Sequence, residues 1–218
     1  MTISIHQPAY NPWLGYFDKI QHSDSFIFLD SVQFEKNSFI NRNKIKTPNG
    51  LLWLTVPVKT KDYKTKSIGE IEIDYSRDWI KSHLRAIEIN YAKSINFEKI
   101  YSFWKEHLEE KEPFLADLCY KQLLGLNKLL NINKPIIRSS KLENKGKKSE
   151  LILNLCVAQR ATEYISGVNG KEYLDVEEFN NRGINVKFQN FISPNYNQLY
   201  GTFIPNLGIL DFLMNNQI

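Results

Sequence analysis

The first thirty residues constrain the fold more strongly than any other part of this 218-residue chain. Residues 2–7 alternate in polarity and are rich in β-branched side chains, which predicts a strand. Over 13–22 the apolar residues follow a helical spacing, and 25–30 is a nearly all-apolar run, typical of a strand covered on both faces. Strand, helix and strand in this order predict a right-handed βαβ unit with two parallel strands.

The rest of the chain extends this pattern around a helical region. Strands are expected at 51–58 and 68–73, with a Pro48-Asn49-Gly50 turn before the first of them, and later at 135–139, 162–166 and 184–191. Helices are expected from Ser149, over 173–181 and over 209–214, and three more within 78–131. We therefore predict an α/β fold, a Rossmann-like, mostly parallel sheet with a helical insertion at roughly 78–131, in a single domain spanning 1–218.

Charge and cysteine content limit the possible functions. The net charge of +4, from 28 basic and 24 acidic side chains, is too small to indicate nucleic-acid binding but suits a phosphate-bearing ligand. Cys119 and Cys156 lie in apolar helical patterns, which predicts buried free thiols of a reducing cytoplasm and no zinc or disulfide framework. No signal peptide pattern and no apolar run long enough for a membrane span is visible, so we expect a cytoplasmic protein without a membrane span.

Polar side chains stand where the predicted strands end, and open α/β sheets bind ligands at the carboxyl ends of their strands. His6 and Gln7 follow the first strand, Asp30 ends the second, and Gly167 follows a later one. If these strands are parallel neighbours, the three ends meet in one crevice. The alternatives are a buried structural histidine for His6 and a turn cap for Asp30.

Two loops supply further candidates. Asn41, Arg42, Asn43 and Lys44 place two amides and two cations within four residues; a guanidinium fork suits phosphate or carboxylate, and amides suit hydroxyl groups. The segment 167–173 carries Gly167, Asn169, Gly170 and Tyr173 at a strand-to-helix junction, where backbone amides could receive an anion. A solvated loop and an ordinary tight turn are the respective alternatives.

Five stretches, quoted at the end of this sentence, together resemble the WbqC-like family of bacterial proteins over nearly the whole chain: "IHQPAYNPWLGYFDKI", "FLDSVQFEKNSFINRNKI", "WLTVPV", "YISGVNGKEYL" and "FISPNYNQLYGTFIPNLGILDFLMN". The resemblance implies a role in a gene cluster for O-antigen, lipopolysaccharide or another surface polysaccharide, with transfer of glycine or another amino acid to an amino sugar as the suggested reaction. The family's recurrent positions overlap with those that the strand-end argument selects.

The residues and the resemblance together lead to one hypothesis: the protein is a transferase or amide ligase that acylates an amino sugar. Its partner would be the nucleotide-linked form of that sugar, the donor ATP or an acyl carrier thioester, and an acyl carrier protein a further partner. We assign catalytic roles to His6, Asp30 and Arg42, and expect no metal and no nucleic acid. Substrate-binding roles fall to Gln7, Trp13, Tyr16, Asn41, Asn43, Lys44, Gly167, Asn169, Gly170 and Tyr173. A nucleotidyl- or glycosyl-transferring enzyme of the same pathway and a non-catalytic assembly partner are the alternatives.

Overall fold

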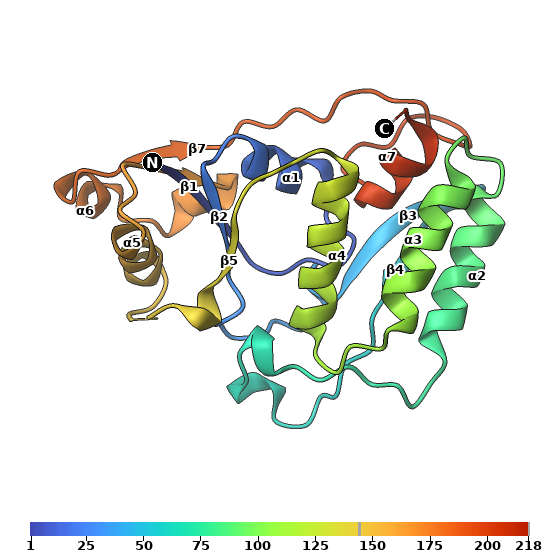
Figure 1. Ribbon diagram of the computed structural model, residues 1–218, viewed down its shortest axis with the longest axis horizontal. Coiled ribbons are helices and arrows are strands. Elements are labelled where there is room, and N and C mark those ends of the chain that lie inside the picture. Colours follow the sequence, from blue (N-terminus) through green and yellow to red (C-terminus); the bar gives the residue numbers. More distant parts are fainter. Residues whose placement is uncertain (144, 218) are drawn as a thin grey trace. The chain divides into compact units, whose positions relative to one another are not determined.

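The computed structural model describes residues 1–143 and 145–217, and the chain divides into two compact units (Figure 1). Unit 1 contains Met1–Gln7, Gly15–Val32 and Ile132–Ile192, and unit 2 contains Pro8–Leu14, Gln33–Asn131 and Ser193–Ile218. Each unit therefore uses segments that are far apart in the sequence. The expectation of one domain over 1–218 stays a prediction.

Unit 1 is built on a five-stranded sheet with the strand order β5-β2-β1-β6-β7. Every neighbouring pair is parallel, and His6 at the end of β1 pairs with Phe28 at the end of β2. The strands are β1 (Thr2–His6), β2 (Ser25–Phe28), β5 (Ile136–Arg138), β6 (Glu163–Ser166) and β7 (Asn185–Phe188). The predicted βαβ opening and the α/β fold with a parallel sheet are confirmed.

Helices cover both faces of this sheet. The buried core on one face joins Ile3, Ile5 and Ile27 of the strands to α5 (Ser149–Ala158) and α6 (Val176–Asn181). The other face packs against α1 (Leu14–Gln21), where the Tyr16 ring lies 5.2 Å from that of Phe26. All four residues of β2 are buried, and burial on both faces explains why three of them in a row, 26–28, are apolar.

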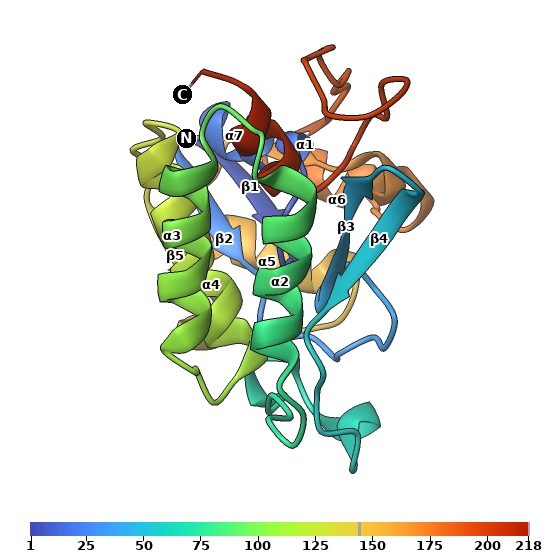
Figure 2. The same cartoon turned by 90° about the vertical axis from the view of Figure 1, so that its right-hand side faces the viewer.

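Unit 2 combines an antiparallel hairpin with four helices within the described residues (Figure 2). The hairpin is β3 (Arg42–Thr47) and β4 (Gly50–Thr55); the helices are α2 (Trp79–Tyr91), α3 (Phe97–Glu109), α4 (Leu115–Leu129) and α7 (Ile209–Asn215). The region 78–131 holds the three expected helices. The Asp78 side chain begins α2 by accepting a hydrogen bond from the Lys81 N–H, and a stripe of apolar residues buries one side of that helix.

Strand β3 was not expected from the sequence, because its six residues include only one apolar side chain, Ile45. Asn43 and Ile45 alternate with half-buried residues and point inward, and so does Asn41 just before the strand. Asparagine can occupy such positions because its amide bonds to buried backbone, a possibility that apolar periodicity does not detect.

Other boundaries also differ from expectation: β4 ends at Thr55 and not at 58, and β7 is shorter than the expected 184–191. The expected strand 68–73 contains a 3₁₀ turn, η2 (Ile68–Glu70), followed by isolated bridges at Glu72 and Ile73. The Ser67-x-x-Glu70 spacing forms a capping box, in which Glu70 accepts a hydrogen bond from the Ser67 N–H at 2.9 Å, and this local bonding favours a turn over a strand. Helix α6 begins at Val176 instead of 173, because the 3₁₀ turn η4 (Val168–Glu172) precedes it and Asp175 caps it.

Candidate functional site

The strand order of unit 1 places a topological switch point beside β1. From β1 the chain builds outward through β2 to β5, then returns to the opposite side of β1 with β6 and β7. At such a point the connections leave the sheet in opposite directions, and ligands of open α/β sheets bind at the carboxyl ends of the flanking strands. His6 ends β1, and Ser166 ends the adjacent β6.

His6 is a neutral hydrogen-bond acceptor at this point. Its Nδ1 lies 3.0 Å from the Gln7 carbonyl oxygen, and because a carbonyl only accepts, Nδ1 carries the proton. Burial, and then the charge of Lys19, lower the pKa of His6 from 6.5 to about 3, while the Gln7 carbonyl acts in the opposite direction. At neutral pH, Nε2 is therefore the unprotonated nitrogen.

Lys19 is a buried amine beside the same strand, and the sequence reasoning missed it. Its side chain is on α1 and its Nζ donates a 2.8 Å hydrogen bond to the Ile5 carbonyl. The residue is only 2% exposed, and burial lowers the pKa of Lys19 from 10.5 to about 7. One signal was available: Lys19 lies three residues after Tyr16, on the helix face that the apolar residues mark as buried.

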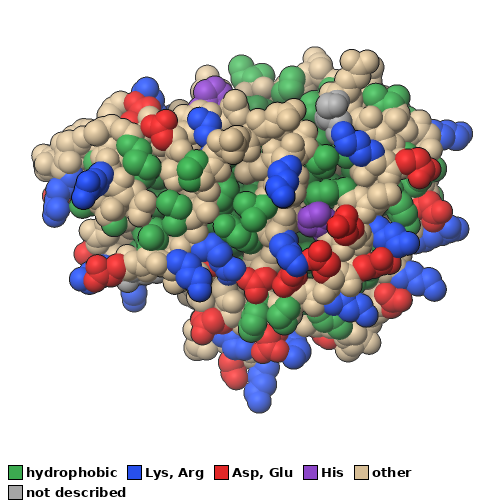
Figure 3. All heavy atoms as spheres, viewed as in Figure 1, with side chains coloured by type: hydrophobic (Ala, Val, Ile, Leu, Met, Phe, Trp, Pro, Cys, Tyr) green, Lys and Arg blue, Asp and Glu red, His purple; other side chains and the backbone are tan. Residues whose placement is uncertain are grey.

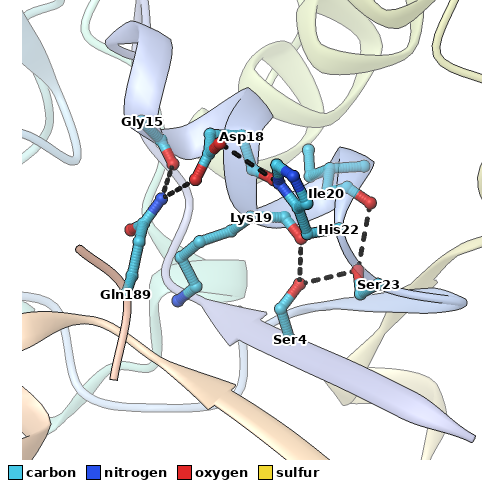
Figure 4. A network of polar contacts seen from close by, with 8 residues as sticks. All are labelled: Ser4, Gly15, Asp18, Lys19, Ile20, His22, Ser23 and Gln189. Carbon is cyan, nitrogen blue, oxygen red and sulfur yellow. Dashed lines mark hydrogen bonds and ion pairs between the residues drawn. The ribbon is translucent and has the colours of Figure 1, made fainter. Parts of the chain in front are cut away.

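A hydroxyl network fixes α1 against β1 and so positions Lys19 (Figure 4). The Ser4 hydroxyl donates to the Lys19 carbonyl at 3.1 Å and lies 3.0 Å from the Ser23 hydroxyl, which donates to the Ile20 carbonyl. At the other side of the helix, the Gln189 amide donates to the Asp18 carboxylate at 2.6 Å. The position of the buried amine is therefore set by several contacts on both strand and helix.

Tyr16 and Gln7 lie in the same cluster, but the tyrosine ring is buried. The Tyr16 hydroxyl donates to the Gln7 carbonyl at 3.1 Å, and its ring centroid is 4.7 Å from that of His6. With 1% of its surface exposed, Tyr16 supports the histidine ring. This packing favours a positioning role for Tyr16 over the predicted stacking on a ligand.

Asp30 is held by the neighbouring strand β5 and the turn that follows it. Its carboxylate accepts hydrogen bonds from Arg138 Nε at 2.6 Å, from the Ser140 N–H at 2.8 Å and from the Ser140 hydroxyl at 2.9 Å. Burial opposes ionisation, but the hydrogen bonds from Ser140 and Arg138 hold the pKa of Asp30 below its usual value. A carboxylate bonded in this way is a poor proton acceptor, so these contacts favour a positioning role over the predicted catalytic one.

The loop after β6 combines open and crowded positions. Asn169 and Tyr173 are exposed, whereas Gly170 is buried against Ser166, whose Oγ would lie 2.0 Å from a Cβ at position 170. A Cβ at Gly167 would meet nothing within 4 Å. Gly170 is thus required by close packing, while Gly167 and Asn169 border open space at the end of β6.

In unit 2, Arg42 and Lys44 share one face of β3 with Trp53 of β4. The Arg42 Cζ lies 4.4 Å and the Lys44 Nζ 4.8 Å from the Trp53 ring centroid, both within cation–π distance. Arg42 also donates to the Asn37 carbonyl. The structure thus brings the two predicted cations together, and it adds an aromatic residue that the sequence reasoning did not select.

The two asparagines between these cations face the interior. Asn41 Nδ2 donates to the Val56 carbonyl at 2.9 Å, and Asn43 Nδ2 donates to the Asn11 carbonyl at 2.6 Å. Both residues are buried, so their contacts favour a structural role over the predicted substrate contact. Trp13 is half-buried and forms an isolated β-bridge with Gly208. The prediction that His6 and Arg42 serve one ligand stays a prediction.

Three further observations concern metal ligands, cysteines and membrane spans. Over residues 1–143 and 145–217 there is no group of three or more His, Cys, Asp or Glu side chains that could hold a metal ion. Cys119 and Cys156 are free and buried, as predicted, and burial raises the pKa of both thiols, that of Cys156 to about 12. Among the same described residues, none of the helices has the length and apolar character that crossing a bilayer requires.

Fold and site together define an α/β protein with a parallel sheet and a polar site at the carboxyl end of its first strand. A family model described as the WbqC-like protein family matches residues 7–218, and the chain belongs to that family. A relative from Mycobacterium tuberculosis, described as uncharacterized protein Rv1507c, is 38% identical over 215 residues, which cover 98% of this chain and 93% of the relative. No solved structure shows significant similarity to the chain.

Proposed function

We propose that this protein is a transferase or amide ligase that acylates an amino sugar, taken as a nucleotide-linked sugar, for a surface polysaccharide made from the cytoplasm. The observation that carries the proposal is the pairing of a neutral His6 with the buried amine of Lys19 at the carboxyl end of β1, beside the switch point. Switch points of this kind hold nucleotide-like ligands in open α/β sheets.

The reaction needs an activated carboxyl group and a neutral amine held together. The amine nitrogen attacks the acyl carbon, the N–C bond forms, and the bond from carbon to the leaving thiolate or phosphate breaks as the tetrahedral adduct collapses. The nitrogen loses one proton on the way, and the leaving group gains it or departs as an anion. Positioning of the two reactants supplies much of the rate enhancement in such a reaction.

His6 Nε2 is suited to receive that proton from the adduct. A base with a pKa of about 3 cannot deprotonate an ordinary ammonium ion, but the cationic nitrogen of a tetrahedral adduct is far more acidic. Lys19 acts through His6: burial is the main cause that keeps the imidazole neutral, and the charge of protonated Lys19 adds to it. The same charge favours negative charge developing on a ligand nearby. Lys19 is therefore a positioning residue.

The remaining predicted residues receive supporting roles. Asp30, fixed by Arg138 and Ser140, shapes the rim of the sheet next to His6. Arg42 and Lys44 would hold an anionic group of a substrate or donor. Gln7, Asn169 and Tyr173 would contact the sugar. The donor class, an acyl adenylate made from ATP or a carrier thioester, is set by the same chemistry, since both present an activated carboxyl group.

Two experiments test the proposal. In the first, the melting temperature of the full chain is measured with a UDP-linked amino sugar, with ATP and Mg²⁺, and with both. Stabilisation by the amino-sugar nucleotide supports acylation, since a ligand that binds only the folded state raises the melting temperature. Response to ATP with release of pyrophosphate points to adenylation of a carboxylate or to nucleotidyl transfer, and no response to either ligand points to a non-catalytic partner.

The second experiment compares two histidine variants by mass spectrometry of the acylated sugar. His6→Gln should lower kcat by about 10²-fold or more, the usual effect of losing a proton acceptor. His22→Gln is the matched control, because His22 is exposed and follows the C-terminal end of α1. Equal rates for both variants and the wild type would remove His6 from the mechanism.

A further inference from the structure

Positive charge is concentrated in one part of the chain. Residues 33–67 carry eight basic and two acidic side chains, so the net charge of this segment is larger than the net charge of +4 of the whole protein. The rest of the chain is therefore slightly acidic. By contrast, basic and acidic side chains are intermixed over much of the face drawn in Figure 3. A local excess of one sign attracts ligands of the opposite sign and accelerates their association.

The segment folds back on itself within unit 2, and we call residues 33–67 the basic lobe. Gln33 forms an isolated bridge with Ser67, the Phe34 N–H donates to the Lys66 carbonyl at 3.2 Å, and the Phe34 and Tyr63 rings meet edge to face. Between these two stretches lies an open hollow of about 480 Å³, lined by Gln33, Phe34, Glu35, Lys36, Tyr63 and Lys64. The ends of the segment are thus joined. Lys46 is buried, and Lys59 and Lys66 pair with Glu72, so the cations that can face a partner are those at positions 36, 42, 44, 61 and 64.

The hairpin of the basic lobe also exposes large apolar side chains. Phe39 is 56% exposed, Leu51 44% and Trp53 39%, and the Phe39 and Trp53 ring centroids are 5.7 Å apart. Scattered single apolar residues are ordinary on a protein surface, but a cluster rimmed by cations indicates an interaction site. The combination suits a partner with both acidic and apolar side chains.

Strand β4 itself has the features of a surface that is normally covered. It is one of two strands in its sheet and carries the residues Gly-Leu-Leu-Trp-Leu-Thr, without a charged side chain or proline. Proteins commonly protect an exposed edge strand with lysine, proline or a bulge. Its neighbour β3 supplies the cations instead, in Arg42 and Lys44.

The contacts of Trp53 favour a protein over a nucleic acid as the occupant. Single-stranded nucleic acids bind by stacking bases on aromatic faces, and here both Arg42 and Lys44 lie over the Trp53 ring. Bases would have to displace these cations before they could stack. A protein helix with acidic residues beside an apolar stripe could bind without displacing the cations, because it would contact only the exposed edges of the rings and the cations around them.

We propose that the basic lobe is the docking surface for an acidic carrier protein that bears the acyl group as a thioester. This inference rests on the proposed acyl transfer, and it names the thioester as the donor. Arg42 and Lys44 would contact the acidic surface of the carrier or the phosphodiester of its arm. Charge complementarity supplies the specificity, and the exposed rings and Leu51 supply the apolar contact.

Binding of the full chain to a bacterial holo acyl carrier protein, measured by isothermal titration calorimetry, tests the inference. We expect binding that weakens at least tenfold between 50 and 300 mM NaCl. The double variant Lys36→Glu/Lys64→Glu should weaken carrier binding at least tenfold. The matched control Lys93→Glu/Lys99→Glu makes the same charge change at exposed sites on and before α3, and it should weaken binding less than twofold. Circular dichroism checks that both variants keep the fold.

Three results would overturn the inference: no binding by the wild type, equal weakening by the two double variants, or poly-uridylate that binds more tightly than the carrier and competes with it. A separate assay distinguishes failure of the proposed function. Acylation of the amino sugar from a small soluble thioester without carrier binding would refute the docking surface alone. Carrier binding without acylation from any donor would refute the acyl-transfer chemistry while leaving the docking surface in place.

Discussion

Replacing Lys19 with methionine tests the buried amine at the carboxyl end of β1. Burial lowers the pKa of Lys19 from 10.5 to about 7, whereas the unfolded chain keeps the ordinary value. Between about pH 7 and pH 10 the unfolded state therefore binds more protons than the native state, and the free energy of unfolding rises with pH. Below pH 7 both states are protonated, and the native state carries the cost of a buried ammonium.

The magnitude follows from the same shift. One pKa unit corresponds to about 1.4 kcal/mol, and the native amine is already half titrated at pH 7, so this group adds about 2 kcal/mol to the free energy of unfolding between pH 7 and pH 9. Lys19→Met keeps the length of the side chain and removes the titration. It also removes the hydrogen bond to the Ile5 carbonyl, a loss that shifts the stability equally at every pH in this range.

The assay is urea unfolding of the wild type and Lys19→Met at pH 6, 7, 8 and 9. All four tryptophans belong to unit 2, so far-UV circular dichroism is the appropriate probe for unit 1. The wild type should gain about 2 kcal/mol relative to the variant between pH 7 and pH 9, and Lys99→Met on α3 should follow the wild type. Parallel pH profiles of the wild type and Lys19→Met would refute the argument for a lowered pKa.

Three further predictions concern the rest of unit 1. The pKa of His6 is lowered to about 3 in the native protein, so the unfolded chain binds this proton more readily and the free energy of unfolding should fall as the pH drops from about 6.5 to 3. In urea unfolding, His6→Gln should flatten this part of the pH profile. An unchanged profile would contradict the lowered pKa. Asp30→Asn should cost about 3 kcal/mol by removing the carboxylate charge that faces the partly buried Arg138. The added change Arg138→Met should recover part of that loss in a double-mutant cycle, and additive losses would argue against the ion pair. Gly170→Ala should lower the free energy of chemical unfolding by about 1–3 kcal/mol because its Cβ meets Ser166. Gly167→Ala, which has open space around it, should change that free energy by less than about 0.5 kcal/mol. Equal effects of the two variants would contradict the packing of this turn.

The first two predicted strands are confirmed because they depend on local pattern, although β2 ends at Phe28 and not at Asp30. Alternation in residues 2–7 and an apolar run in 25–30 are direct consequences of a strand pleat and of burial on both faces. His6 at the end of β1 follows from these boundaries alone. Arg42 and Lys44 were selected together only because they lie close in the sequence. They share a face because residues two positions apart on a strand point to the same side, and the sequence did not predict this strand.

Residues whose environment comes from distant segments were harder to interpret. The partners of Asp30 lie 108 to 110 positions later in the chain, so no local pattern indicated that its carboxylate is already bonded. The sequence predicts that the Asn41 and Asn43 amides contact a substrate, whereas in the structure both donate hydrogen bonds to backbone carbonyls within unit 2. Trp53 was passed over because its place above Arg42 and Lys44 depends on the β3–β4 register.

The sequence by itself determined the parallel βαβ opening, the order of most elements and the position of His6 where a strand ends, since strand and helix periodicities are properties of short segments. Only the tertiary structure decided which polar side chains are buried and what they contact. Lys19 shows the reason: its pKa is lowered because packing against strand β1 excludes the water that would otherwise keep a lysine side chain charged.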